Sequence, residues 1–172
     1  MVVIGIISDT HISSVNYSDV GIKLLRQLRD TFKDVDEIIH AGDISSEVFL
    51  KDLNDIAPVI CVNGHEDFLD LNSFIKLKRR NYTIGVIHEQ PKDLEKFCRE
   101  NGLHILIFGH THQPLIKGTN FNTLLINPGS PTYPKAPPSK PGFKIPVPKP
   151  TVVILIIDKD NILSTYLINL KS

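Results

Sequence analysis

The sequence predicts an α/β fold. Apolar, β-branched runs of strand length alternate with segments of helical periodicity through residues 1–62, and each apolar run is followed by a polar turn. A strand–helix–strand–helix–strand order is typical of a right-handed parallel sheet. The chain has 172 residues, of which 41% are hydrophobic and 22% charged, so we expect one globular domain covering residues 1–172.

The first half of the chain contains three predicted strands and two predicted helices. Val2–Ile7 is a continuous apolar run, which indicates a strand covered on both faces. Apolar residues recur every four positions from Val20 to Phe32 and predict a helix, with Ser18 and Asp19 as candidate caps. The remaining elements of this half are a strand at 37–40, a helix at about 48–56 and a strand at 59–62.

The second half begins with a predicted hairpin, whose strands start at Phe74 and at Tyr82 and flank a basic turn. An apolar stripe between Pro91 and Gly102 predicts a third helix, with proline in its first turn and glycine just past its end. Cys98 on this stripe and Cys61 in an earlier apolar run are both expected to be reduced core residues. Further strands are predicted at 105–108, 123–126, 151–157 and 162–168.

The segment from Pro128 to Pro150 contains nine of the twelve prolines, and we expect it to be an irregular, largely extended surface excursion. Unstructured connections longer than about 12–15 residues are uncommon inside domains. The excursion, at about 130–150, is therefore a candidate for a role at the rim of a functional cleft or in a homo-oligomer contact.

Metal-binding side chains follow five of the predicted strands. In open α/β sheets the loops at the carboxyl ends of the strands converge on one crevice, so these side chains are expected to meet. Two pairs are spaced i, i+2, which in an extended segment directs both side chains to the same side. Carboxylate and imidazole donors without thiolate suit Mn, Zn, Fe or Ni better than Ca or Mg. The candidate ligands are Asp9, His11, Asp43, His65, His88, His110 and His112.

Seven candidate ligands exceed the needs of one tetrahedral ion. They suit two ions about 3.5 to 4 Å apart that share a carboxylate, an arrangement that clamps the attacking and leaving oxygens in phosphoryl transfer. Asp43, held in a turn of small residues between two groups of candidates, is the expected bridge. The expected cofactors are two divalent ions, Mn first, with Zn, Ni or Fe as alternatives.

Taken in order, the motifs SDTH, HAGD, NGHED, GHTH and NPGS, together with His88, resemble the calcineurin-like metallophosphoesterases, specifically their small prokaryotic phosphodiesterase branch. The resemblance covers Val3 to about Ser130 and the final strands. It implies a two-sheet β-sandwich flanked by helices, an α/β/β/α architecture. It also implies a first metal held by Asp9, His11, Asp43 and His112, and a second held by Asp43, position 65, His88 and His110.

Two positions depart from the family pattern. The family usually has Gly-Asn in the fourth motif, with Asn as a metal ligand, whereas here Gly64 is followed by His65 and the asparagine comes earlier, at Asn63. We favour His65 as the ligand because imidazole is a competent donor at the same spacing, with Asn63 as the alternative. His88 is followed by Glu89, where the family commonly has glycine, and this carboxylate would crowd the site or add negative charge beside it.

Asp43, His65 and Glu66 form the candidate catalytic set. Some relatives place a proton-donating histidine where this chain has Glu66. If His65 binds a metal, no evident proton donor for the leaving group remains, and catalysis would depend on the ions and favour good leaving groups.

Four further features have alternative explanations. His40 and His104 are expected in the core or beside a ligand, because each lies in or next to a strand. Residues 127–130 are expected either to form a simple tight turn or, in addition, to contact substrate or support His112. The basic residues at 76–80 resemble a nucleic-acid-binding patch, but we favour the alternative that they belong to an exposed hairpin turn without any partner.

The resemblance implies a phosphodiesterase that hydrolyses small phosphate esters by metal-activated water. Nucleic acid is a possible but less favoured substrate, and the alternative function is a protein-interaction scaffold, as in the retromer subunit of similar fold. No apolar run reaches the ~18 residues that a membrane span needs, and we expect a cytosolic protein. The net charge of zero conceals a split, since residues 1–100 carry 12 bases and 17 acids, while 101–172 carry 7 bases and 2 acids. The basic second half would attract an anionic substrate.

Overall fold

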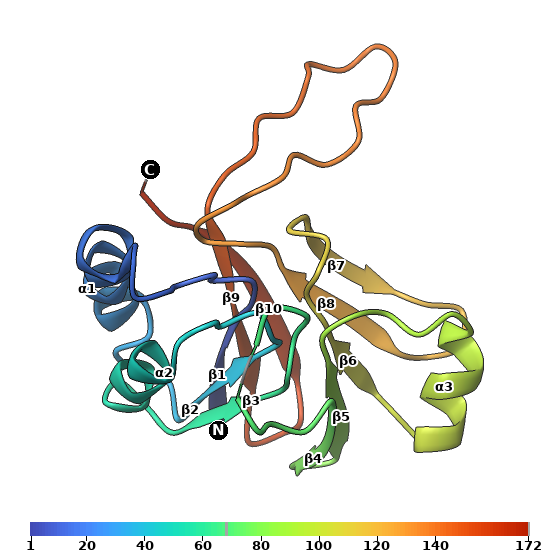
Figure 1. The fold of residues 1–172 in the computed structure, drawn as a ribbon. Helices are drawn as coiled ribbons and strands as arrows, with labels where there is room; N and C mark the ends of the chain where they lie inside the picture. The colour runs from blue at the N-terminus through green and yellow to red at the C-terminus, as the bar shows by residue number, and fades with distance from the viewer. Residues whose placement is uncertain (68, 172) are drawn as a thin grey trace.

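Two five-stranded mixed sheets form the centre of the structure, a computed structural model that describes residues 1–67 and 69–171 (Figure 1). The first sheet has the order β10-β9-β1-β2-β3, with bounds β1 Val2–Ile7, β2 Glu37–His40, β3 Val59–Cys61, β9 Thr151–Ile157 and β10 Leu163–Asn169. The second has the order β4-β5-β6-β8-β7, with bounds β4 Phe74–Arg79, β5 Tyr82–Ile87, β6 Ile105–Ile107, β7 Pro114–Gly118 and β8 Leu124–Pro128.

Helices cover the outer faces of the sheets. The helices α1 (Ile22–Thr31) and α2 (Glu47–Asn54) lie against the first sheet, and α3 (Leu94–Asn101) lies against the second (Figure 1). The expected α/β/β/α sandwich is confirmed. The strands β1, β2 and β3 pair in parallel, as the alternation of strands and helices predicts, and β4 and β5 form the predicted hairpin.

The core has three layers of apolar side chains. In β1, Ile4 and Ile6 point into the layer between the sheets, whereas Ile7 belongs to the layer beneath α1 and α2. This strand is therefore covered on both faces, as its uninterrupted apolar run predicts. Cys98 is part of the third layer, beneath α3, and Cys61 is also buried and reduced.

An ion pair between β2 and β4 joins the two sheets. Arg79 in β4 donates two hydrogen bonds to the Glu37 carboxylate in β2, Nε to Oε1 at 2.6 Å and one terminal nitrogen to Oε2 at 2.5 Å. Of the basic hairpin residues, Arg79 is thus neutralised inside the molecule, while Lys76, Lys78 and Arg80 are exposed. This pairing accounts for one of the four charges of the hairpin.

Three local features differ from the sequence prediction. The strand β7 was not predicted, because it begins with a proline and pairs only at the edge of its sheet, where proline is tolerated. A single π-helical turn, Tyr17–Gly21, precedes α1, so the regular helix begins later than expected. The third helix begins at Leu94, after the cap Asp93, whose side chain accepts a hydrogen bond from the Lys96 N–H, and Pro91 lies outside it.

Residues 131–150 contain neither helix nor strand and project from the body as a long loop (Figure 1). Phe143, Ile145 and Val147 are exposed on it. Within the described part of the chain, no helix has the length and apolar character needed to span a membrane.

Candidate metal centre

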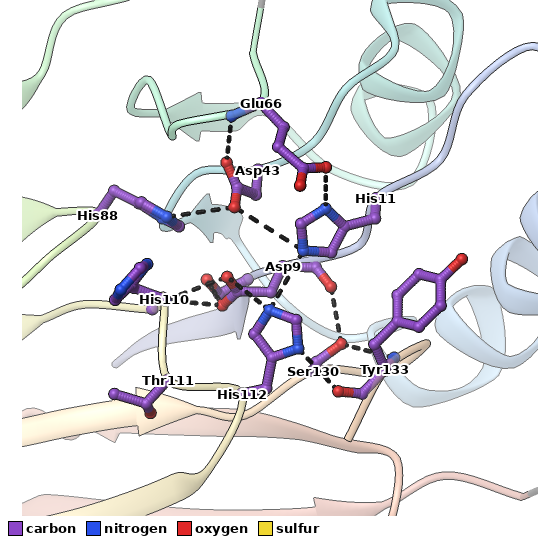
Figure 2. Close-up of polar contacts among 12 residues, drawn as sticks. Asp9, His11, Asp43, Glu66, His88, His110, Thr111, His112, Ser130 and Tyr133 are labelled. Carbon is purple, nitrogen blue, oxygen red and sulfur yellow. Dashed lines mark hydrogen bonds and ion pairs between the residues drawn. The ribbon is translucent and has the colours of Figure 1, made fainter. Parts of the chain in front are cut away.

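The predicted ligands gather at one edge of the sandwich, in loops that follow strands of both sheets, and Figure 2 labels all of them except His65. The first sheet contributes Asp9, His11, Asp43 and His65, and the second contributes His88, His110 and His112. In three groups, one donor atom from each residue lies within 4.8 Å of the others. The groups are His65 with His88 and His110, Asp9 with His11 and His112, and Asp9 with Asp43 and His88.

Five of these residues have a left-handed backbone, with φ between 46° and 67°, a conformation that is uncommon outside glycine. They are Asp9, His11, Asp43, His110 and His112. The expectation that the i, i+2 pairs lie in extended segments is therefore wrong, because both members of each pair turn the chain away from the strand. Strained backbone of this kind clusters at functional sites, where the surrounding structure holds it.

Asp43 lies between the groups. Its Oδ2 is 3.3 Å from His88 Nε2 and 3.8 Å from His11 Nε2, and its Oδ1 accepts the Glu66 N–H at 2.9 Å. Burial raises the pKa of the Asp43 carboxyl, but the adjacent His88 imidazole and the Glu66 N–H outweigh burial and hold this pKa well below its usual range. Asp43 is therefore a carboxylate at neutral pH.

Asp9 is the second buried carboxyl of the centre. Both of its oxygens accept the His110 N–H at 3.0 Å, and Oδ1 lies 3.5 Å from His112 Nε2. Burial raises the pKa of Asp9, opposed by the Ser8 hydroxyl and the His88 imidazole. A bound cation would favour the charged form of this carboxyl.

Carbonyl oxygens fix the orientation of two histidines. Nδ1 of His88 donates to the Ala41 oxygen at 2.8 Å, and Nδ1 of His112 donates to the Tyr133 oxygen at 2.8 Å. Because a carbonyl can only accept, each ring carries its hydrogen on Nδ1 and presents a lone pair on Nε2 whenever it is neutral. His88 Nε2 is buried and makes no hydrogen bond within the described residues. A buried nitrogen that faces two carboxylates fits a divalent cation.

A second group consists of three imidazoles. The His65, His88 and His110 rings have centroids 4.9 to 5.4 Å apart, at nearly perpendicular angles. Glu89 Oε2 lies 3.3 Å from His65 Nε2, and Oε1 lies 3.9 Å from His110 Nε2, so the Glu89 carboxylate borders this group. Asn63, the alternative ligand, has its side-chain oxygen buried and without a hydrogen bond among the described residues.

Glu66 contacts two candidate ligands. Its Oε2 lies 2.8 Å from His11 Nδ1, and its N–H donates to Asp43 (Figure 2). The side chain is 66% exposed. A carboxylate on Nδ1 directs His11 Nε2 toward the carboxylates of the centre, the same orientation that the carbonyls give His88 and His112.

Two anchoring groups are not evident from the sequence. Asp67 Oδ2 accepts the N–H groups of Asp43 and Gly64 at 2.9 and 2.8 Å, and Oδ1 accepts the Ser45 N–H at 2.7 Å. The sequence feature that could have indicated this role of Asp67 is the presence of an aspartate within a tight turn, where main-chain N–H groups need an acceptor. A Cβ on Gly64 would lie 2.2 Å from the Asp43 nitrogen, so only glycine allows the two loops this approach.

The turn 127–130 steadies the centre. The Ser130 hydroxyl donates to the Asp9 main-chain oxygen at 2.7 Å, and Asn127 Nδ2 donates to the Gly109 oxygen at 2.8 Å. Of the alternatives for this turn, the structure shows a supporting role that connects the Asp9 loop with the loop of His110 and His112.

The other two histidines differ in position. His40 is fully buried, its Nε2 lies 3.0 Å from Thr10 Oγ1, and burial lowers the pKa of His40 to about 3. His104 is exposed, and its Nδ1 accepts the Thr83 N–H at 3.0 Å. The expectation of a core or ligand-supporting position is therefore wrong for His104, because its side chain is exposed in the bend just before β6.

An open cleft of about 1180 Å³ lies over the ligands. It is lined by the candidate ligands His11, Asp43, His65, His110 and His112. Further lining residues are Ser13, Asn16, Ser45 and Glu66, together with Tyr133, Pro134 and Lys135 at the start of the projecting loop. A substrate in this cleft would have direct access to the candidate ligands.

A two-sheet sandwich with carboxylate and imidazole donors gathered beneath an open cleft is typical of metallohydrolases. Residues 2–146 match the model of the calcineurin-like phosphoesterase superfamily domain, and the chain belongs to this superfamily of metal-dependent hydrolases of phosphate esters. It is 40% identical to a probable metallophosphoesterase of Methanocaldococcus jannaschii over 78% of this chain and 70% of the relative. It is 34% identical to a probable metallophosphoesterase of Methanothermobacter thermautotrophicus over 92% of this chain and 88% of the relative.

Solved structures share the fold. A predicted phosphoesterase from Streptococcus pneumoniae is 20% identical with a TM-score of 0.71, covering 97% of this chain and 88% of that one. An archaeal phosphodiesterase is 24% identical with a TM-score of 0.66, covering 96% and 99%. Vps29 from Entamoeba histolytica in complex with zinc is 21% identical with a TM-score of 0.69, covering 97% and 98%.

Proposed function

We propose that this protein is a dinuclear metal-dependent phosphodiesterase. The observation that carries the proposal is the position of Asp43, whose Oδ2 faces His11 in one candidate group and His88 in the other. A carboxylate that is shared by two ions has to lie between two sets of donors, and Asp43 meets this requirement.

The proposed ligands of the first ion are Asp9, His11, Asp43 and His112, and those of the second are Asp43, His65, His88 and His110. When bound, the ions supply Lewis acidity that activates water and stabilises charge on the phosphate. Carboxylate and imidazole donors suit Mn, and the three imidazoles of the second set also suit Zn, Ni or Fe. The carbonyls of Ala41 and Tyr133 hold His88 and His112 with their Nε2 atoms toward the carboxylates.

Glu66 is proposed as a positioning residue for His11. Its carboxylate accepts the Nδ1 hydrogen and so selects the tautomer whose Nε2 can bind a metal. With Glu66 in this role and His65 in the ligand set, no side chain is assigned to protonate the leaving group. We therefore propose that the protein prefers esters with good leaving groups.

The test is hydrolysis by purified protein from which metal has been removed with a chelator and to which Mn, Ni or Zn has been restored. We expect hydrolysis of bis(p-nitrophenyl) phosphate, a diester, to exceed that of p-nitrophenyl phosphate, a monoester. Hydrolysis of neither compound with any of the three metals would reject the proposal. Faster hydrolysis of the monoester would retain the phosphoesterase and reject the phosphodiesterase.

A protein-interaction scaffold is the second candidate, and the likeness in fold to Vps29 favours it. The two functions differ in what they require of the centre. Elemental analysis after metal repletion distinguishes them, because close to two ions per chain is expected of the enzyme and none of a scaffold with a degenerate site.

A further inference from the structure

The base of the projecting loop is fixed to the metal centre by main-chain hydrogen bonds. The Tyr133 oxygen accepts from His112 Nδ1 at 2.8 Å, and the Lys135 N–H donates to the His112 oxygen at 3.1 Å. The Tyr133 N–H donates to Ser130 Oγ at 2.9 Å. Residues 133–135 are therefore held in place by backbone atoms, and their side chains are available for other contacts.

The Tyr133 ring lies beside the ligands and remains accessible. Its centroid is 5.6 Å from that of the His11 ring, at an interplanar angle of 76°, and the residue is 54% exposed (Figure 2). Tyr133 also lines the cleft. An aromatic ring that is fixed at one edge and exposed elsewhere offers a stacking surface to a flat group in the cleft.

Among the described residues that line the cleft, Lys135 is the one Lys or Arg. The other fixed charges there are the carboxylates of Asp43 and Glu66. The sequence around Lys135 contains no Asp or Glu from residue 101 to residue 157. Its ammonium group therefore has no acidic neighbour along its own segment. An anionic group of a bound ligand is a suitable partner for it.

We propose that Tyr133 and Lys135 form a subsite for the part of the substrate that lies beyond the reacting phosphate, and that this part contains an aromatic ring and a second anionic group. The inference rests on the proposed function, since it takes the reacting phosphate to lie over the candidate ligands. Nucleotides that carry a second phosphate combine these features. The ring would stack on Tyr133, and the second phosphate would pair with Lys135.

Equilibrium binding tests the subsite without relying on turnover. Calorimetry of the Mn-loaded full chain compares thymidine bisphosphate, with a phosphate at each end of the sugar, with thymidine monophosphate and deoxyribose phosphate. We expect about tenfold tighter binding of the bisphosphate than of the monophosphate, because a charge-assisted contact is added. Lys135→Ala should abolish this preference.

Lys140→Ala is the matched control, because Lys140 is an exposed lysine of the same loop outside the cleft lining. It should retain the preference. Tyr133→Ala should weaken the binding of thymidine monophosphate about fivefold to tenfold without changing the binding of deoxyribose phosphate. Tyr133→Phe should bind both ligands as the unmodified protein does. Both variants keep the main-chain contacts to His112, so a loss that is shared by all three ligands would indicate damage to the centre and would overturn the assignment.

Equal affinity for the bisphosphate and the monophosphate would overturn the inference, as would a preference that survives Lys135→Ala or is equally lost in Lys140→Ala. Hydrolysis of bis(p-nitrophenyl) phosphate, measured in parallel, separates this failure from that of the proposed function. Hydrolysis without the binding preference rejects the subsite alone. A preference without hydrolysis rejects the phosphodiesterase and leaves a nucleotide-binding cleft.

Discussion

The Asp67 carboxylate holds the backbone of Asp43, whose N–H donates to Asp67 Oδ2 at 2.9 Å. The same carboxylate accepts the N–H groups of Gly64 and Ser45. One side chain therefore joins the loop that presents Asp43 to the loop that presents His65 and Glu66. The position of the proposed bridging ligand depends on a residue that is itself outside the candidate ligand set.

Asp67→Asn should destabilise the protein and weaken metal binding. An asparagine keeps one acceptor oxygen and places an NH₂ group against main-chain donors, so we expect a loss of about 2 to 4 kcal/mol in the free energy of unfolding. Urea denaturation of metal-free protein measures it. Asp70→Asn is the control, because Asp70 is exposed in the same segment. Equal stability of the two variants would contradict the anchoring role.

Asp43→Ala should abolish the binding of both ions, because it removes the carboxylate that faces both donor groups. We expect a fall in metal affinity of at least about a hundredfold, larger than the 10- to 100-fold typical of residues that only support ligands. Calorimetric titration with Mn measures this, together with loss of hydrolysis. Asp19→Asn, an exposed carboxylate, serves as control. Retention of one ion at full affinity would show that Asp43 does not bridge.

His65→Ala and Asn63→Ala distinguish the two candidates for the second ion. The three imidazoles of His65, His88 and His110 form one donor group, so we expect His65→Ala to reduce the metal content from two ions to one per chain. Asn63→Ala should retain two. Elemental analysis after repletion and gel filtration gives the counts, and loss of the second ion only in Asn63→Ala would reverse the assignment.

Glu66→Ala should lower the affinity of the first ion about 10- to 100-fold, because the His11 ring loses its orienting acceptor. Glu66→Gln should lose less affinity for the first ion, since an amide oxygen can still accept the Nδ1 hydrogen of His11. The dependence of the rate on the leaving-group pKa should be the same in both variants as in the unmodified enzyme. A steeper dependence in Glu66→Gln would identify Glu66 as the proton donor instead.

His40 should make the stability of the metal-free protein depend on pH. Burial lowers the pKa of His40 from 6.5 to about 3, so the unfolded chain binds this proton first as the pH falls. The contribution of neutral His40 to the free energy of unfolding is fully present above pH 6.5 and is lost as the pH falls toward 3. By pH 5 the loss amounts to about 2 kcal/mol. His40→Gln should show a shallower decline between pH 7 and 5, measured by urea denaturation with a chelator present.

The unmodified protein, denatured under the same conditions, provides the control for this measurement. An identical decline in the His40→Gln variant and the unmodified protein would show that His40 does not carry the effect.

The parallel strands and their polar ends follow directly from the sequence, because buried strands require continuous apolar residues and chain polarity gathers their carboxyl ends at one edge. The strand β7 could not be predicted in this way. Its apolar residues Leu115 and Ile116 are exposed, and it forms by pairing with β8 rather than by burial. The local sequence pattern of β7 contains no information about the strand with which it pairs.

The candidate ligands were evident as residue types, but their geometry was not. Spacing suggested extended pairs at Asp9/His11 and His110/His112, whereas the backbone is left-handed at all four positions. This conformation depends on contacts between distant segments, such as the His110 N–H with Asp9 and the Ser130 hydroxyl with the Asp9 oxygen. The anchoring role of Asp67 has the same origin, since its three donors come from two different loops.

Each of the three donor groups includes residues from both sheets. A slip of one sheet along the other by a single residue step, about 3.3 Å, would equal the distance from Asp43 to His88 and separate the donors without changing either sheet. The affinity of the candidate centre for metal therefore depends on how the two sheets are aligned. Substitutions between the sheets, far from the cleft, would change metal affinity by altering this alignment.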